Sequence, residues 1–86
     1  MRYLIENDHL GKRYFDKEAS TLVYSKENWC TWYDLYLTKN NNWVMFSRNN
    51  IGGRKIWVNQ FTIEEAQKFL RDDIETYEKY FKIDEI

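Results

Sequence analysis

The residues able to support catalysis are few and stand far apart in this chain. His9 is the only histidine and Cys30 the only cysteine, and a nucleophile with its base also needs a third group that orients the base. His9 falls in a predicted turn near the start of the chain, so we interpret both residues as surface or packing residues. Gly52-Gly53 lacks the spacing of a phosphate-binding loop, and we interpret it as a hinge.

A metal site and a cofactor are not expected either. One cysteine can form neither an internal disulfide nor a cysteine zinc cage. The acidic residues near the C-terminus point to different sides of a predicted helix, and neighbouring lysines compete for them; they are Asp72, Asp73, Glu75 and Glu78. We interpret them as a solvated helix face and predict a protein that is not an enzyme and binds no cofactor.

The chain is instead rich in aromatic residues. Its 86 residues include four Trp, seven Tyr and five Phe, and no proline. A domain of this size buries only about 60–65% of its unfolded surface, and each large ring can bury roughly 150–250 Å². The rings therefore serve the core first, and only a surplus is available for binding. We expect residues 1–86 to form a single domain.

Strand-like segments fill the first two thirds of the chain. They cover residues 2–6, 12–16, 20–24, 31–38, 43–47 and 55–58. The clearest hairpin turns at residues 39–42, where asparagines tolerate the positive φ of a tight turn. Side-chain alternation places Tyr33, Leu35 and Leu37 on one face, which we assign to the core, and Asp34 on a half-exposed face.

One long helix is predicted after the last strand. Thr62 and Glu65 have the spacing of a capping box, and apolar residues such as Ile63, Leu70 and Ile74 then recur at helical spacing up to Phe81. The predicted fold class is α+β: an antiparallel β-sheet of about four to five strands followed by one long C-terminal α-helix, residues 63–81, packed on one face. The opposite face must then meet solvent or a partner.

Candidate partner-binding residues surround the loop that contains the two glycines. They are Arg48, Asn49, Asn50, Arg54 and Lys55, with Trp32 and Trp57 nearby. Arginine beside aromatic rings is an arrangement that contacts phosphates and stacks on bases. A solvated loop next to core tryptophans is the alternative interpretation.

Two tryptophans stand three residues apart, at Trp29 and Trp32. On a regular strand they point to opposite faces, so both enter one core only if a bulge or turn intervenes. One of them is a candidate exposed anchor, of the kind enriched at interface hot spots. Burial against the N-terminal segment is the competing account.

Charge is divided unevenly along the chain, although the net charge is only −1. Residues 1–60 hold nine Lys and Arg against six Asp and Glu, whereas residues 61–86 hold four against eight. This allows two surfaces of opposite sign, the acidic one suited to a basic groove on another protein. No apolar run is long enough for a signal peptide or a membrane span, so we expect a cytoplasmic protein without membrane contact.

Several segments carry a family resemblance. They are Lys12-Arg13-Tyr14-Phe15-Asp16, Glu18-Ala19, Leu35-Tyr36-Leu37-Thr38-Lys39 with Asn42-Trp43, Gly52-Gly53 with Lys55-Ile56, and Thr62 with Glu64-Glu65-Ala66. Together they resemble a group of small, mostly uncharacterised proteins of Gram-positive bacteria and their mobile elements. The resemblance covers about residues 12–70. It departs at Asn41, where glycine is usual, and in a shortened 48–54 loop. It implies a fold and a genomic setting, and no catalytic residues.

The resemblance favours a function in binding. Small single-domain proteins in that setting often act by binding, and inhibitors of host defence nucleases such as anti-CRISPR proteins are similar in size and composition. Our first hypothesis is a non-enzymatic phage or mobile-element protein that inhibits a host nucleic-acid-targeting defence complex, with a host protein or ribonucleoprotein as partner. The alternatives are a nucleic-acid-binding accessory protein that uses the basic, aromatic loop, and a module that self-associates, as in a homodimer, through an open sheet face or edge strand.

Overall fold

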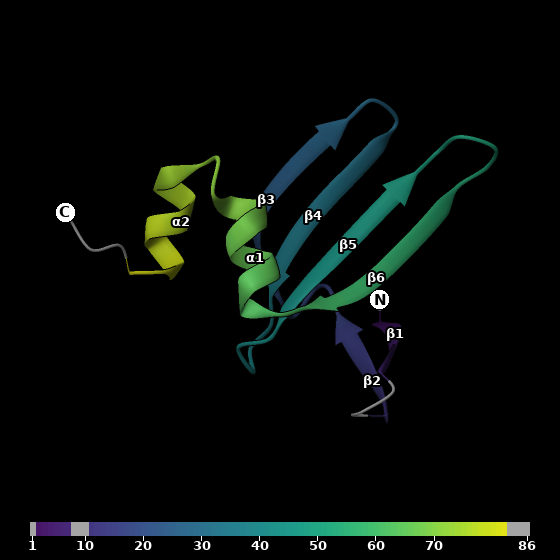
Figure 1. The fold of residues 1–86 in the computed structure, drawn as a ribbon. Coiled ribbons are helices and arrows are strands. Elements are labelled where there is room, and N and C mark those ends of the chain that lie inside the picture. Colours follow the sequence, from purple (N-terminus) through teal and green to yellow (C-terminus); the bar gives the residue numbers. More distant parts are fainter. Residues whose placement is uncertain (1, 8–10, 83–86) are drawn as a thin grey trace.

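The computed structural model describes residues 2–7 and 11–82 of the chain, so the turn predicted around His9 lies outside the described residues. The elements are β1 (Arg2–Asn7), β2 (Gly11–Asp16), β3 (Thr21–Asn28), β4 (Thr31–Leu37), β5 (Trp43–Asn49), β6 (Lys55–Phe61), α1 (Ile63–Leu70) and α2 (Ile74–Tyr80) (Figure 1). β3 to β6 form a four-stranded antiparallel sheet in chain order, and β1 and β2 form a separate two-stranded one. The α+β class is confirmed, but the strands are divided between two sheets.

One face of the four-stranded sheet, which we call the helix side, packs against the helices. Ala66 and Leu70 of α1 are both 0% exposed, and they join Leu35, Trp43 and Met45 of the sheet in one core cluster. Tyr33 and Leu37 pack against the same cluster. The predicted assignment of the Tyr33, Leu35 and Leu37 face to the core is therefore confirmed.

The opposite face, which we call the hairpin side, is covered in part by β1 and β2. Ile5 and Phe15 of this hairpin are buried with Tyr36, Val44 and Phe46 of the sheet. The expectation that this whole face meets solvent or a partner is therefore wrong. Because β5 lies between the two layers, its residues are buried without interruption from position 43 to position 47.

The predicted single helix is two short helices. The capping box is confirmed, since the Glu65 amide donates to Thr62 Oγ1 at 3.1 Å and the Thr62 amide donates to Glu65 Oε1 at 2.9 Å. The first helix ends at Leu70, and Asp73 caps a second one by accepting a hydrogen bond from the Thr76 amide at 3.2 Å. Aspartate is favoured at an N-cap and disfavoured within a helix, which explains a break at this point.

The break redirects the C-terminal rings onto the sheet. Tyr80 and Phe81 reach Trp43, with ring centroids 5.6 Å and 5.4 Å away. Ile63 and Ile74 were both predicted to lie on the buried stripe of a single helix, but each is 57% exposed. The helices therefore cover the sheet with Ala66, Leu70 and the aromatic rings after the break, and the two isoleucines of the predicted stripe are left exposed.

Within the described part of the chain, a positive φ falls on asparagine or glycine, with one exception. Asn41 has a φ of 63° and Gly53 a φ of 108°, as the sequence predicts for the two loops. Trp29 has a φ of 56°, in the turn between β3 and β4. A tryptophan in this region of backbone conformation is uncommon and unfavourable.

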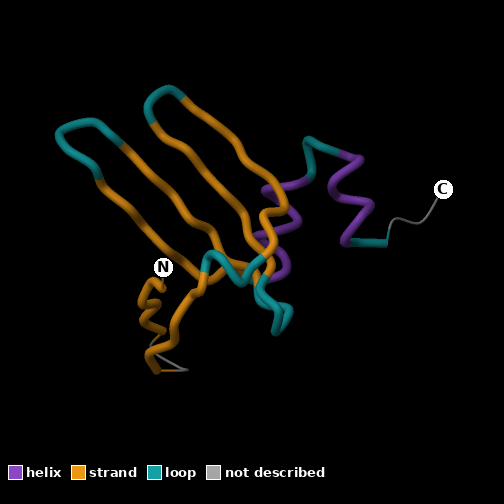
Figure 2. The backbone as a smooth tube through the Cα atoms, turned by 180° about the vertical axis from the view of Figure 1, so that it is seen from behind, coloured by secondary structure: helices purple, strands orange, loops and turns teal. Residues whose placement is uncertain are grey.

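Both long hairpins end at the same end of the sheet. The β3–β4 turn and the β5–β6 loop project away from α1 and from the β1–β2 hairpin (Figures 1 and 2). Within the described part of the chain, no helix is long and apolar enough to cross a membrane. The projecting end is where the sequence-based candidates lie.

Candidate binding surface

We call the residues at the projecting end of the two hairpins the tip surface; it comprises residues 29–30 of the β3–β4 turn and residues 50–55 of the β5–β6 loop. Trp29 is 82% exposed and Ile51 is 48% exposed. Asn50, Arg54 and Lys55 are exposed as well. Apolar and cationic side chains thus share a surface that no other element of the described chain covers.

Trp29 is the residue of this surface that packing explains least. Its ring gains little burial, and its backbone lies in the left-handed region, which costs an L-residue roughly 1–2 kcal/mol. The turn also resolves the question of the two tryptophans, because Trp32 lies on β4 and is half-buried, whereas Trp29 is the exposed one.

The sequence-based candidates are divided between the two sides of the sheet. The register pairs Trp32 with Arg48 and Arg48 with Ile56, so these three residues share the hairpin side. Asn49 and Trp57 stand on the helix side, one step along their strands. Asn50 and Arg54 belong to the loop itself.

On the hairpin side, Arg48 and Trp32 form a cation–π pair. The Arg48 guanidinium carbon lies 5.6 Å from the centroid of the Trp32 ring, a cation–π contact. The Nε atom of Arg48 is buried and has no hydrogen-bond partner among the described residues. A buried donor left unsatisfied is costly, so the position of this side chain carries a cost in folding stability.

Tyr36 lies further along the same side, under the N-terminal hairpin. Burial raises the pKa of its phenol above the ordinary value, and the carboxylate of Asp34 raises it further. The Asp34 carboxylate accepts a hydrogen bond from the Ser25 hydroxyl at 2.7 Å. The pKa of Tyr36 thus reports on whether the hairpin covers the sheet.

On the helix side, Asn49 has a structural role. Its amide nitrogen donates to Thr31 Oγ1 at 2.8 Å, and its amide oxygen accepts from the Ile51 amide at 2.7 Å. It therefore ties the β5–β6 loop to β4. Trp57, 45% exposed, stands in one row with Ser47 and Tyr33.

The charged residues near the tip surface are mostly cationic. Residues 24–33 and 47–57 contain Lys26, Arg48, Arg54 and Lys55, and a single acid, Glu27. Lys26 is partly engaged, because its Nζ atom lies 4.5 Å from the Phe69 ring centroid and 3.9 Å from Asp72 Oδ2. The end of the molecule that carries the tip surface is thus suited to an anionic partner.

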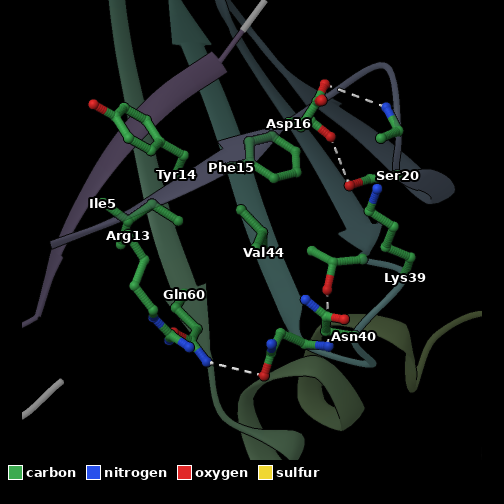
Figure 3. Close-up of a pocket in the computed structure, with 13 residues that line it drawn as sticks. Ile5, Arg13, Tyr14, Phe15, Asp16, Ser20, Lys39, Asn40, Val44 and Gln60 are labelled. Carbon is green, nitrogen blue, oxygen red and sulfur yellow. Dashed lines mark hydrogen bonds between the residues drawn. The ribbon is translucent and has the colours of Figure 1, made fainter.

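A hollow lies at the end of the molecule away from the tip surface, between the N-terminal hairpin and the sheet, with a volume of about 150 Å³. Figure 3 shows Arg13 and Gln60 on one side of it and Ser20 and Lys39 on the other, with Phe15 between them. Much of its polar rim is occupied by local bonds, such as the one that the Ser20 hydroxyl donates to the Asp16 carbonyl at 2.8 Å. Sequence reasoning missed this hollow because its walls come from β2, β6 and the turn after β4.

Comparisons of the chain with protein-family models, with curated proteins and with solved structures gave no match. The function must therefore be argued from the residues of the chain itself. Sequence reasoning placed Trp32 in the binding set and left Trp29 as one of two alternatives. The sequence signal that Trp29 is the exposed one was its position in a turn, beside Asn28 and just before the strand-like run that begins at Thr31.

Proposed function

We propose that the protein is a small non-enzymatic protein of a phage or other mobile element that binds and inhibits a host nucleic-acid-targeting defence complex, and that the tip surface makes the contact. The observation that carries the proposal is Trp29, a bulky ring held 82% exposed at a backbone φ of 56°. Asparagine or glycine at this position would satisfy the turn at a lower cost. A residue that is unfavourable for folding points to a role in binding.

The neighbouring residues support a protein contact. Ile51, on the other hairpin, adds a second exposed apolar side chain at the same end of the sheet. Tryptophan and arginine are the residue types that most often dominate the binding energy of an interface. The cations Arg54 and Lys55 on the same surface favour an acidic partner, such as a ribonucleoprotein.

A cleavage assay tests the proposal. Purified protein is added to host defence nucleases loaded with guide and target, and the inhibition constant is measured for the wild type and for Trp29→Ala and Ile51→Ser. Loss of a hot-spot residue costs at least about 2 kcal/mol, so we expect inhibition about 30-fold weaker or more for Trp29→Ala.

The matched control is Ile63→Ser, because Ile63 is an exposed isoleucine on α1, with 57% of its surface accessible against 48% for Ile51. This variant should inhibit as the wild type does. If the wild-type protein neither co-elutes with any such nuclease nor lowers its cleavage, the proposal fails.

Direct binding of nucleic acid is the second candidate. The observation that favours it is the cation–π pair of Arg48 and Trp32, close to the exposed cations Arg54 and Lys55. Phosphate contacts make affinity fall steeply with salt, and removal of one such contact lowers the slope of log K against log salt by about one. Arg54→Ala should reduce the slope in this way. Binding that is absent, or independent of salt, would exclude this candidate.

A further inference from the structure

The helix side of the sheet has an open slot between two aromatic rings, beyond the part that the helices cover. A hollow of about 280 Å³ is lined by Thr31, Tyr33, Ser47, Asn49, Trp57 and Asn59. Tyr33, Ser47 and Trp57 are direct neighbours across β4, β5 and β6. The small side chain between two large ones leaves a slot whose floor is Ser47, which is 7% exposed.

The spacing of the strands sets the width of this slot. Tyr33 and Trp57 are two strands apart, which corresponds to roughly 9–10 Å between their backbones. A planar ring in contact with an aromatic face on each side needs about 7–8 Å between the two faces. Strand side chains stand roughly perpendicular to the sheet, so the spacing of the strands is close to what one flat ring between the two side chains requires.

Polar groups at the slot are free to bind a ligand. Within the described part of the chain, no hydrogen bond ties the Ser47 hydroxyl or the Asn59 amide to another residue. Asn49 lies on the other side of Ser47 from Asn59, and its side chain is held in place by its two hydrogen bonds, to Thr31 and to Ile51. An amide offers a donor and an acceptor together, which suits the edge of a nucleobase.

The charge around the slot complements a phosphate backbone. Lys55 pairs with Asn49 on the helix side, two residues before Trp57 on β6. Lys26 of β3 pairs with Tyr33 of β4. No strand residue on this side between the slot and the hairpin ends is acidic, and Asp72 beside Lys26 comes from the segment after α1. A wider hollow of about 700 Å³ shares Tyr33, Ser47 and Asn59 with the slot and extends past Lys26 and Glu27, giving room for a strand to continue. Glu27 is the one acidic residue in its lining.

We propose that this slot binds one unpaired nucleobase of a single-stranded nucleic acid, stacked between Tyr33 and Trp57, while the backbone passes Lys55 and Lys26. The inference deepens the second candidate function above and rests on it. It assigns the ligand to the helix side of the sheet, whereas the cation–π pair of Arg48 and Trp32 lies on the hairpin side. Duplex nucleic acid does not fit, because its bases are paired and stacked.

Fluorescence anisotropy with labelled 12-nucleotide single strands of DNA and RNA, and with the matching duplexes, tests the inference. Stacking on an aromatic side chain predicts that Trp57→Ala weakens single-strand binding roughly 5- to 150-fold. Ser47→Leu, which fills the floor, should weaken it as well. Tyr14→Ala is the matched control, because Tyr14 is an aromatic strand residue that is 72% exposed and outside the slot.

Near-UV circular dichroism shows whether each variant keeps its fold, and Lys55→Gln gives an independent readout at an exposed position, where the salt slope should fall by about one. Equal affinity for single strands and duplexes, unchanged by Trp57→Ala and Ser47→Leu but lowered by Arg54→Ala, would overturn the slot and leave the second candidate function standing. No binding to any oligonucleotide would overturn both. Inhibition of a defence nuclease without oligonucleotide binding would overturn both and leave the first proposal.

Discussion

Replacement of Phe15 by alanine tests whether the N-terminal hairpin is a structural layer of the domain. The Phe15 side chain is 1% exposed, and its ring centroid lies 5.3 Å from that of Tyr36 and 6.3 Å from that of Tyr3. Removal of a buried Phe side chain costs about 3–5 kcal/mol. A domain of this length has a free energy of unfolding of roughly 4–13 kcal/mol. Phe15→Ala should therefore remove a quarter or more of the stability.

The adjacent residue supplies the matched control. Tyr14 lies on the other face of β2 and is 72% exposed, so Tyr14→Ala should change the free energy of unfolding by no more than about 0.5 kcal/mol. Urea denaturation followed by tryptophan fluorescence measures both variants against the wild type. If Phe15→Ala and Tyr14→Ala are equally mild, the hairpin does not pack on the sheet, and the face that carries Tyr36 is open after all.

Three further predictions concern the helix break, the buried phenol and the sheet edge. Asp73→Ala removes the N-cap of α2 and should cost about 1 kcal/mol in a thermal melt, against a few tenths for Asp72→Ala; equal effects would contradict the capping role. The pKa of Tyr36 is raised in the folded state, so the contribution of its neutral phenol to stability is complete below about pH 10 and is lost as the pH rises through the folded value. Tyr36→Phe should therefore flatten the loss of stability above about pH 10 when urea denaturation is repeated at increasing pH. An unchanged profile would count against burial of the phenol. The edge strand β3 carries a bulge and Lys26, features that discourage edge-to-edge pairing of two copies. Light scattering should therefore give a mass of 10.7 kDa at all protein concentrations. A mass that rises with concentration would instead favour the homodimer.

Local signals in the sequence were sufficient for the capping box and for the face of β4 that enters the core. Thr62 and Glu65 act over three residues, and the alternation of Tyr33, Leu35 and Leu37 depends only on strand geometry. The helix break was harder to predict, because apolar residues continue at helical spacing beyond it. Tertiary contacts of Trp43 with the later rings favour two short helices over one long helix.

Features that depend on the pairing of distant strands could not be read from local pattern. The N-terminal hairpin forms its own sheet and covers Tyr36, although nothing in residues 2–16 specifies which surface it joins. The candidate site was predicted from neighbours in sequence, yet alternation sends Arg48 and Asn49 to opposite sides. The slot depends on the register of three strands, so only the structure brings its residues together.

The most direct test of the tip surface is a paired measurement on Trp29→Asn. Asparagine tolerates the positive φ of this turn, and the ring it replaces is 82% exposed, so the free energy of unfolding should stay the same or rise by up to about 1 kcal/mol. Inhibition of the defence complex by the same variant should fall about 30-fold or more. A stable variant that inhibits as well as the wild type would contradict a binding role for Trp29. A loss of more than about 1 kcal/mol in stability would show that the ring serves the fold instead.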